Sequence, residues 1–215
     1  LKEAYLRDFP PESLWEVYGS TELSVCTALA PEDQLRKPGS CGRPAPGVEI
    51  LLVGDDGELI DEPHVPGELY ARSAGLFETY HKAHDRFLDD HRDGFQTVGD
   101  IAYADPDGYL YICDRKKDMI ITGGVNVYPA EGENALDAHP HVAEGAVIGV
   151  PDPEWGEAVC AVVVPDGTLD LVDLAAFAAE KLSGPKRPKR VEVVDELPKT
   201  GTGKVLKRDL RSFLG

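Results

Sequence analysis

The chain has 215 residues, of which 42% are hydrophobic, and a formal net charge of −17. This length allows one large or two small domains, and the composition is ordinary for a globular protein. The acidic balance argues against a nucleic-acid-binding protein. No apolar run approaches the roughly 18 residues that a membrane-spanning helix needs. We therefore expect a cytoplasmic protein with no nucleic-acid partner and no membrane span.

The first residues, LKEAYLRDFPPE, have neither the basic nor the apolar segment of a signal peptide. They do not begin with methionine, so we expect a fragment or a processed product. The four cysteines, Cys26, Cys41, Cys113 and Cys160, lie far apart without a CxxC pair. This spacing predicts reduced thiols in a cytosolic protein.

Charge is unevenly distributed along the chain. Residues 181–215 contain ten Lys/Arg and four Asp/Glu, whereas residues 1–180 contain twelve and thirty-five. A basic end on an acidic body suits a polyanionic ligand, or docking of that end on the body. A solvated helix face explains the same pattern equally well, and charge alone leaves both interpretations open.

Most of the first half has the apolar alternation of strands, interrupted by turn sequences. The segment 76–92 is helix-like instead, although its amphipathic pattern is weak. We expect residues 30–114 to form a small barrel or sandwich. Strands or hairpins are predicted at 17–24, 47–62 with a turn at 54–57, 65–73, and 95–115 with a turn at 105–108.

The second half alternates strands with helices, which predicts a compact α+β domain over residues 115–215. One helix is expected to start at Pro129, because proline suits a first helical turn. The chain as a whole is therefore predicted to be α+β, with a β-rich, barrel-like unit over 1–114. Strands are predicted at 118–124, 142–152, 158–167 and 190–197, and helices at 129–140, 171–182 and 203–214.

Single motifs have ordinary explanations. Glu22 alone is typical of a surface carboxylate, and DRKKD at 114–118 is typical of a solvated turn. His81 and His84 have a metal-like spacing, but no further ligand completes a zinc site. The segment 200–204 lacks the first glycine and the final Ser/Thr of the phosphate-binding loop.

The series of motifs is far more specific than any one of them. In order, the chain contains YGSTE, GRPAPGVEI, GELYARS, VGDIAYADPDGYLYICDRKKDMIITGGVNVYPAEGEN and LPKTGTGKVLKRDL. This series resembles the adenylate-forming superfamily, specifically its acyl-CoA synthetases, and the resemblance covers nearly the whole chain. It implies an enzyme that uses ATP and Mg²⁺ to convert a carboxylic acid to an acyl-adenylate. The acyl group then passes to coenzyme A, and AMP leaves.

The resemblance implies a nucleotide site in the first half. Tyr18 is expected along the adenine, with Gly19 at the turn beneath it. Thr21 is expected to contact the α-phosphate, and Glu22 to hold Mg²⁺ on the phosphates. By the same resemblance, Asp100 accepts hydrogen bonds from the ribose hydroxyls, and Arg115 reaches the ribose or the phosphates.

The resemblance also implies the roles of the second half, a small mobile domain of the adenylate-forming fold. Lys117 matches the hinge between the large domain and the small one. Gly123 and Gly124 match the point where the pantetheine arm of coenzyme A passes the backbone, where an absent side chain permits close approach. Lys204 matches the lysine that bridges carboxylate and α-phosphate during adenylation, delivered by a mobile Gly-Thr loop to the start of the last helix.

The chain lacks two features that the family has. The Ser/Thr/Gly-rich loop with lysine that grips the triphosphate, and most of the acyl pocket, lie upstream of YGSTE in this family. We therefore expect residues 1–114 to be the end of the large AMP-binding domain, 115–215 the small domain, and the isolated chain to be inactive or nearly so. Exposure of the truncated face should leave apolar surface, which predicts a homodimer or aggregation.

Three alternatives stay open at this point. The segment DRKKDMIITGGVNVYP resembles fatty-acyl and aryl CoA ligases more than peptide-synthetase adenylation domains. We expect a medium- or long-chain fatty acid as substrate, with an aryl or other carboxylate as runner-up. A luciferase-like oxidation of the adenylate uses the same motifs. A non-catalytic module that binds nucleotide or a partner protein is the alternative from another class, although it has no physical need for Glu22, Asp100, Arg115 and Lys204 together.

Overall fold

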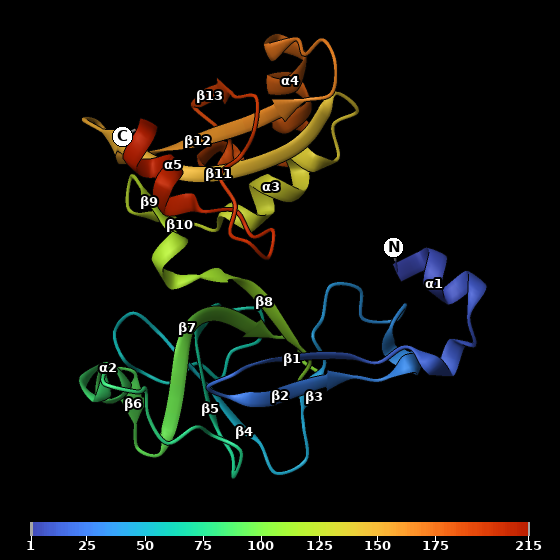
Figure 1. Ribbon diagram of the computed structural model, residues 1–215, viewed down its shortest axis with the longest axis vertical. Helices are drawn as coiled ribbons and strands as arrows, with labels where there is room; N and C mark the ends of the chain where they lie inside the picture. The colour runs from blue at the N-terminus through green and yellow to red at the C-terminus, as the bar shows by residue number, and fades with distance from the viewer. Residues whose placement is uncertain (1, 215) are drawn as a thin grey trace. The chain divides into compact units, whose positions relative to one another are not determined.

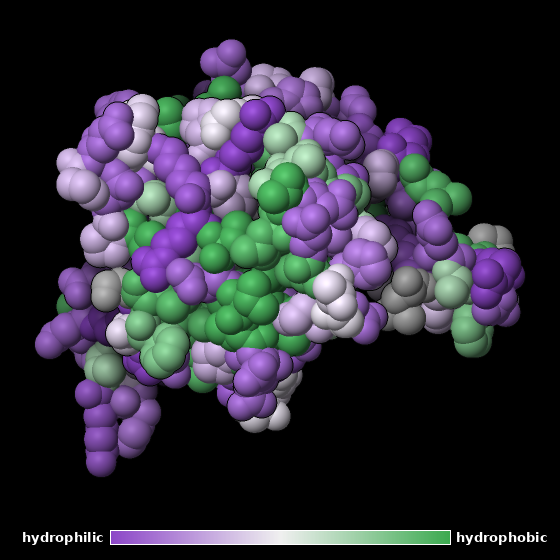
Figure 2. Space-filling model, turned by 90° about the horizontal axis from the view of Figure 1, so that it is seen from above, coloured by the Kyte–Doolittle hydropathy of each residue, from purple (hydrophilic) through white to green (hydrophobic). Residues whose placement is uncertain are grey.

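The structure is a computed structural model that describes residues 2–214. It divides into two compact units, Leu1–Lys116 and Lys117–Gly215 (Figure 1). Within the described residues, no helix is long and apolar enough to cross a membrane. One face of the molecule carries a patch of apolar side chains surrounded by hydrophilic ones (Figure 2).

The first unit consists of two antiparallel sheets. Strands β1, β2 and β3 form one sheet, and β4, β5, β7 and β6 follow one another in the second, where β8 also pairs with β7. A bridge between Gly42 and Leu110 links the two sheets. The elements are α1 (Lys2–Asp8), β1 (Glu16–Ser20), β2 (Ser24–Leu29), β3 (Arg43–Pro44), β4 (Glu49–Val53), β5 (Gly67–Arg72), α2 (His84–Asp89), β6 (His91–Arg92), β7 (Phe95–Ala104) and β8 (Leu110–Arg115).

Alternation of side chains explains the core of this unit. Successive residues of a strand point to opposite faces, so every second residue of β5 is buried. Leu23, Leu69 and Ala102 have no exposed surface and belong to one core cluster. The predicted α+β class, with a β-rich first half, is confirmed.

The predicted helix over 76–92 is wrong for most of its length. Only α2, His84–Asp89, is helical, and the preceding residues form turns and irregular backbone. Aromatic contacts take the place of helix hydrogen bonds, because Phe77 packs against both Tyr80 and Phe87 with ring centroids 4.8 and 5.3 Å apart. Tertiary contacts of this kind override a weak helical pattern.

The second unit is a five-stranded sheet with helices on both faces. Its strands run in the order β10, β9, β12 and β11, and β13 pairs with β12 in parallel. The hairpin of β9 and β10 was not predicted as such, since only its first strand was expected. The elements are β9 (Ile120–Thr122), β10 (Val125–Val127), α3 (Pro129–Asp137), β11 (Val142–Asp152), β12 (Gly156–Pro165), α4 (Leu171–Lys181), β13 (Arg190–Val193) and α5 (Lys207–Leu214).

Both faces of this sheet are covered, which explains the nearly continuous apolar runs of β11 and β12. Val159 and Val163 belong to the core cluster that includes Leu136 of α3 and Leu174 of α4. The alternate residues of β12 belong to a second cluster with Leu210 of α5. Two helices therefore cover one face, and the last helix covers the other.

The last helix begins later than predicted. The sequence predicted a helix from residue 203, but α5 begins at Lys207. A bridge between Lys199 and Val205 and a hydrogen bond from Thr200 N to Lys204 O, 2.8 Å, fold the preceding residues into a tight hairpin. Gly203 has φ +85°, which ends any helical path there.

A partly buried ionic cluster stabilises the first unit. Lys37 Nζ donates to Asp105 and to Asp107, each at 2.6 Å, and lies 4.7 Å from the ring centroid of Tyr109. Burial alone raises the pKa of Asp105, but the Lys37 ammonium and the backbone N–H groups of Tyr109 and Asp107 lower it overall. Hydrogen bonds from Tyr109 and Arg36 likewise lower the pKa of Asp33.

Acid should therefore destabilise this unit through these carboxylates. A folded-state pKa below the unfolded value adds stability above the unfolded pKa, about 3.9 for Asp, and that stability is lost as the pH falls toward the folded value. We expect a lower urea midpoint at pH 3 than at pH 6 by circular dichroism. In Lys37→Met the difference between the two pH values should shrink, because Asp105 loses its cation. An unchanged difference would contradict this assignment.

Candidate nucleotide and acyl-transfer site

The structure brings together three of the predicted residues of the first half. Tyr18 of β1 donates its hydroxyl to Asp100 Oδ2 at 2.7 Å. Arg115, at the end of β8, approaches the other carboxylate oxygen of Asp100 with its Nε, at 3.0 Å. Burial, followed by the hydrogen bond to Asp100, raises the pKa of Tyr18, so the phenol stays protonated and remains a donor. We call these residues the Tyr18–Asp100–Arg115 cluster.

Local backbone geometry positions Asp100. The preceding Gly99 has φ +77°, in the left-handed region that favours glycine, and its N–H donates to Thr97 Oγ1 at 2.9 Å. The register of β5 and β7 shifts between Glu68 and Tyr70, next to this point. Such an irregularity re-aims the side chains that follow it. Asp100 itself is only 7% exposed, although it is a carboxylate.

Gly19 lies inside β1 and not at a turn, which corrects the prediction. The register of β1 and β2 shifts between Tyr18 and Gly19, and a Cβ at Gly19 would lie 2.0 Å from Ser24 O. Glycine is therefore required here by the close approach of the two strands. The turn itself comprises the three residues that follow Ser20, including exposed Thr21.

Glu22 is held by a residue that the sequence analysis missed. Tyr80 donates its hydroxyl to Glu22 Oε1 at 2.9 Å, and Arg86 lies 4.7 Å from the Tyr80 ring centroid. Burial alone raises the pKa of Glu22, but backbone and hydroxyl donors, including Tyr80, lower it overall. The oxygen atoms of an ionised carboxylate are ligands that Mg²⁺ prefers. No local pattern indicated Tyr80, because the segment around it was interpreted as a helix.

The boundary between the units has an anchored residue on each side. Lys116 Nζ pairs with Glu68 at 2.7 Å in the first unit. Asp118 accepts from Arg211 of α5 at 3.0 Å in the second unit. The exposed Lys117 lies between these two anchored neighbours.

Gly123 and Gly124 form the turn between β9 and β10, with φ +57° and +77°. Gly123 N donates to Trp155 O at 2.9 Å, and a Cβ at Gly123 would lie 2.6 Å from the Trp155 ring. Lys189 Nζ lies 3.7 Å from the centroid of the same ring. Trp155 was not singled out from the sequence, although its turn sequence, PDPEWG, is a loop signal.

Lys204 is exposed on the tight hairpin that precedes α5. Its N–H donates to Thr200 Oγ1 at 3.1 Å, and Gly203 N donates to Thr200 O at 2.9 Å. The prediction placed Lys204 at the start of a helix, on a mobile loop. The structure places Lys204 before that helix, in a turn closed by these hydrogen bonds, and the mobility of the loop stays a prediction.

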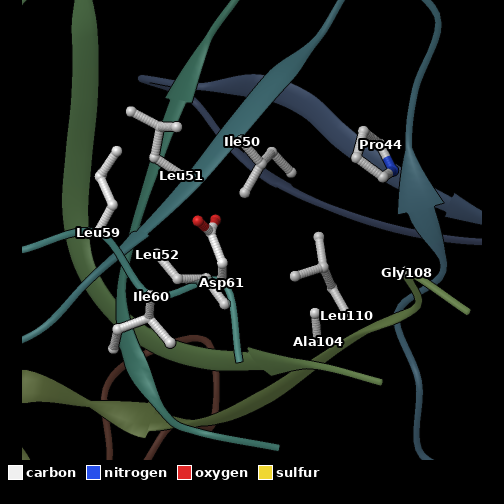
Figure 3. A pocket seen from close by; sticks show the side chains of 10 residues that line it. All are labelled: Pro44, Ile50, Leu51, Leu52, Leu59, Ile60, Asp61, Ala104, Gly108 and Leu110. Carbon is white, nitrogen blue, oxygen red and sulfur yellow. The ribbon is translucent and has the colours of Figure 1, made fainter. Parts of the chain in front are cut away.

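A hollow of the first unit contains none of these residues. It has a volume of about 250 Å³ and is lined mainly by aliphatic side chains, including Ile50, Leu52 and Ile60. Asp61 points its carboxylate among them (Figure 3). Among the described residues, no group of three His, Cys, Asp or Glu side chains could hold a metal ion.

Two family models match the chain. Residues 1–81 match the AMP-binding enzyme family, and residues 131–204 match the AMP-binding enzyme C-terminal domain. The chain belongs to the AMP-binding enzyme family. Tyr18 and Glu22 lie in the first matched range, and Lys204 is the last residue of the second.

The chain has relatives that are ligases of different acids. It is 41% identical to indoleacetate–CoA ligase of Aromatoleum aromaticum over 100% of its own length and 42% of that protein. It is 43% identical to a long-chain-fatty-acid–CoA ligase of Escherichia coli O157:H7, covering 92% of itself and 35% of that protein. The chain therefore spans less than half of these relatives.

A solved structure has the same fold as this chain. The o-succinylbenzoate CoA synthetase of Bacillus subtilis, in complex with its acyl-adenylate intermediate, superimposes with a TM-score of 0.90 at 33% sequence identity. The match covers 98% of this chain and 43% of that one. The predicted family and fold are thereby confirmed.

Proposed function

We propose that the chain is the C-terminal portion of an ATP-dependent, AMP-forming acid–thiol ligase. In the first step, a carboxylate oxygen of the acid attacks the α-phosphorus of ATP and pyrophosphate leaves. In the second step, the thiol sulfur of coenzyme A attacks the acyl carbon, AMP leaves and the thiol proton is released. The observation that carries the proposal is the Tyr18–Asp100–Arg115 cluster.

This cluster is suited to a nucleotide sugar. Asp100 is a nearly buried carboxylate that accepts from Tyr18 with one oxygen and forms an ion pair with Arg115 through the other. Each oxygen has a further lone pair. Two neighbouring ribose hydroxyls are donors that a fixed carboxylate can accept. Solved relatives contain AMP, ATP with magnesium ion, or an acyl-adenylate, which supports the same assignment.

The turn after β1 is suited to the phosphates. Glu22 offers an ionised carboxylate, and Thr21 an exposed hydroxyl, two residues or fewer from β1. When bound, Mg²⁺ would offset the negative charge of the phosphates. Tyr80 keeps the Glu22 carboxylate oriented for that role.

The second unit supplies Lys204 for adenylation and the Gly123–Gly124 turn for acyl transfer. Lys204 is an exposed ammonium, suited to bridge the carboxylate of the acid and the α-phosphate. Lys117 is the proposed hinge between the two steps. The ion pairs of Lys116 and Asp118 support it, because each ties one neighbour of Lys117 to its own unit.

The acid is proposed to be a medium- or long-chain fatty acid, with an aryl acid as second candidate. Relatives of both kinds match with similar identity. Carboxylate-dependent ATP–pyrophosphate exchange decides between them, measured over a panel of fatty and aromatic acids. The assay uses this chain and the longest reading frame that includes it. Exchange with neither form would sink the ligase assignment and leave a nucleotide-binding module.

We also infer a homodimer of the isolated chain. Large apolar side chains of the first unit are exposed, among them Trp15 at 60%, Val17 at 63% and Leu35 at 73%. Apolar surface of this kind favours self-association. Sedimentation equilibrium should give twice the chain mass at high concentration. A monomer over the whole concentration range would contradict this inference.

A further inference from the structure

The turn at Gly123 and Gly124 is attached to the rest of the second unit through few backbone bonds. On one side, β9 pairs with β10 from Ile120 to Thr122. Toward β12 the register contains the pair Thr122 and Gly156. Gly123 N also donates to Trp155 O. Backbone pairing alone therefore leaves Ile121 N–H without a partner on the β12 side.

A side chain supplies the missing acceptor. Glu157, the residue after Gly156, accepts from Ile121 N with its Oε2 at 2.7 Å. This carboxylate takes the place of a backbone acceptor between the two strands, two residues before Gly123. The Ile121 side chain is 50% exposed, so water would reach this N–H if the carboxylate were absent.

Gly149 of β11 makes room for the carboxylate. A Cβ at Gly149 would lie 2.6 Å from Glu157 Oε1 and 3.0 Å from its Cδ. The same Cβ would lie 3.2 Å from Ile120 Cγ2, so the side chain of Glu157 occupies the space between β11 and β9. A larger residue at position 149 would push the carboxylate away from Ile121.

The neighbouring turn is itself fixed. Asp152 Oδ1 accepts from Glu154 N and from Trp155 N, both at 2.9 Å. These bonds lower the pKa of Asp152, so it stays ionised as an acceptor. The backbone that leads to Glu157 is therefore held in place by Asp152. The Glu157 carboxylate in turn binds β9.

We propose that Glu157 is a positioning residue that fixes the Gly123–Gly124 turn for the pantetheine arm of coenzyme A. This inference rests on the proposed function, in which that turn serves acyl transfer. It adds a residue that contacts neither the acid nor ATP. Loss of the Glu157 bond should loosen the turn and weaken coenzyme A binding, while the fold of the unit is kept.

Amide hydrogen exchange by NMR on the 215-residue chain tests the positioning directly. In Glu157→Ala, exchange at Ile121 and Gly123 should become about tenfold faster, as expected for loss of one bond to a charged acceptor. Glu157→Gln keeps an oxygen acceptor and should restore most of the protection. Gly149→Ala keeps the carboxylate but displaces it, and should also accelerate exchange at Ile121.

Asp137→Ala is the matched control. Asp137 Oδ1 accepts from Gly145 N at 3.0 Å, so this variant also removes a carboxylate bound to a backbone N–H of the same unit. It should leave the exchange of Ile121 and Gly123 unchanged. Equal exchange at these amides in Glu157→Ala and Asp137→Ala would overturn the proposal.

Titration of the same samples with coenzyme A tests the consequence. The Kd should rise about three- to tenfold in Glu157→Ala and stay near the parent value in Glu157→Gln and Asp137→Ala. A loosened turn with an unchanged Kd would overturn the role toward coenzyme A. A parent chain without any coenzyme A shifts would contradict the second step of the proposed function, and amide exchange would still decide whether Glu157 fixes the turn.

Discussion

Replacing Asp100 by asparagine should weaken AMP binding to this chain by about 10- to 100-fold, because hydrogen bonds to a charged group are worth about 1.5–3 kcal/mol each. The carboxylate faces two donors in the protein, Tyr18 O–H and Arg115 Nε. An asparagine presents one oxygen and one NH₂, so a donor would face a donor on one side. Fewer acceptor sites then remain for the ribose hydroxyls.

Isothermal titration with AMP measures this effect, and Asp93→Asn is its control. Asp93 has φ +51° in the turn between β6 and β7, a conformation that asparagine tolerates, so this control removes one negative charge without strain. AMP affinity should be unchanged in the control. Equal AMP affinity in Asp100→Asn and the parent would refute the ribose assignment.

Tyr18→Phe keeps the result interpretable if Asp100→Asn folds poorly. This variant keeps the carboxylate and removes one neutral donor from it. We expect AMP affinity to fall by about threefold, in line with the net value of a single neutral hydrogen bond. Thermal unfolding of all three variants separates a loss of fold from a loss of binding.

Local sequence chemistry predicted the parts of the fold that local chemistry determines. The turn at 105–108 contains Asp-Pro-Asp-Gly, whose residues suit a turn individually, and Gly108 has φ +78° there. The helix α4 follows its apolar periodicity, and the side chain of Asp170 caps it by accepting from Val172 N. Neither feature needs information from distant parts of the chain.

The failures have a shared cause, which is contact between distant residues. The segment around Tyr80 does not form the predicted helix, because its aromatic rings pack on one another. The Tyr80 hydroxyl also reaches Glu22, 58 residues away in the sequence. The hairpin before α5 was missed because its bridge, Lys199 to Val205, competes with a helical pattern that is equally legible in the sequence.

The candidate site also depends on contacts between distant residues that the sequence did not predict. Resemblance to the family named Tyr18, Asp100 and Arg115 one by one, but only the structure places the first two in contact across 82 residues of sequence. The role of Gly19 changed as well, since its missing side chain is explained by Ser24 O of the neighbouring strand. Glu157 carries no local signal at all, because its acceptor role depends on the space above Gly149.

Lys204→Ala should have the largest effect on the first chemical step. We expect carboxylate-dependent ATP–pyrophosphate exchange to fall by about 100-fold or more, which is typical for loss of a group that stabilises developing charge. Lys204→Arg should recover little, since a planar guanidinium does not replace a compact point charge.

Arg208→Ala is the matched control, and a divided assay completes the test. Arg208 is a cation four residues after Lys204, and its side chain is 87% exposed. Its replacement by alanine therefore removes one positive charge, as Lys204→Ala does, but outside the hairpin. Exchange should stay within about twofold of the parent, because a solvent-exposed ion pair contributes little.

Both variants are made in the reading frame that supports exchange. When acyl-adenylate is supplied directly, thioester formation by Lys204→Ala should match the parent, since the Gly123–Gly124 turn serves that step. An equal loss in both half-reactions would mean that Lys204 supports the unit as a whole, and the assignment to adenylation would then be wrong.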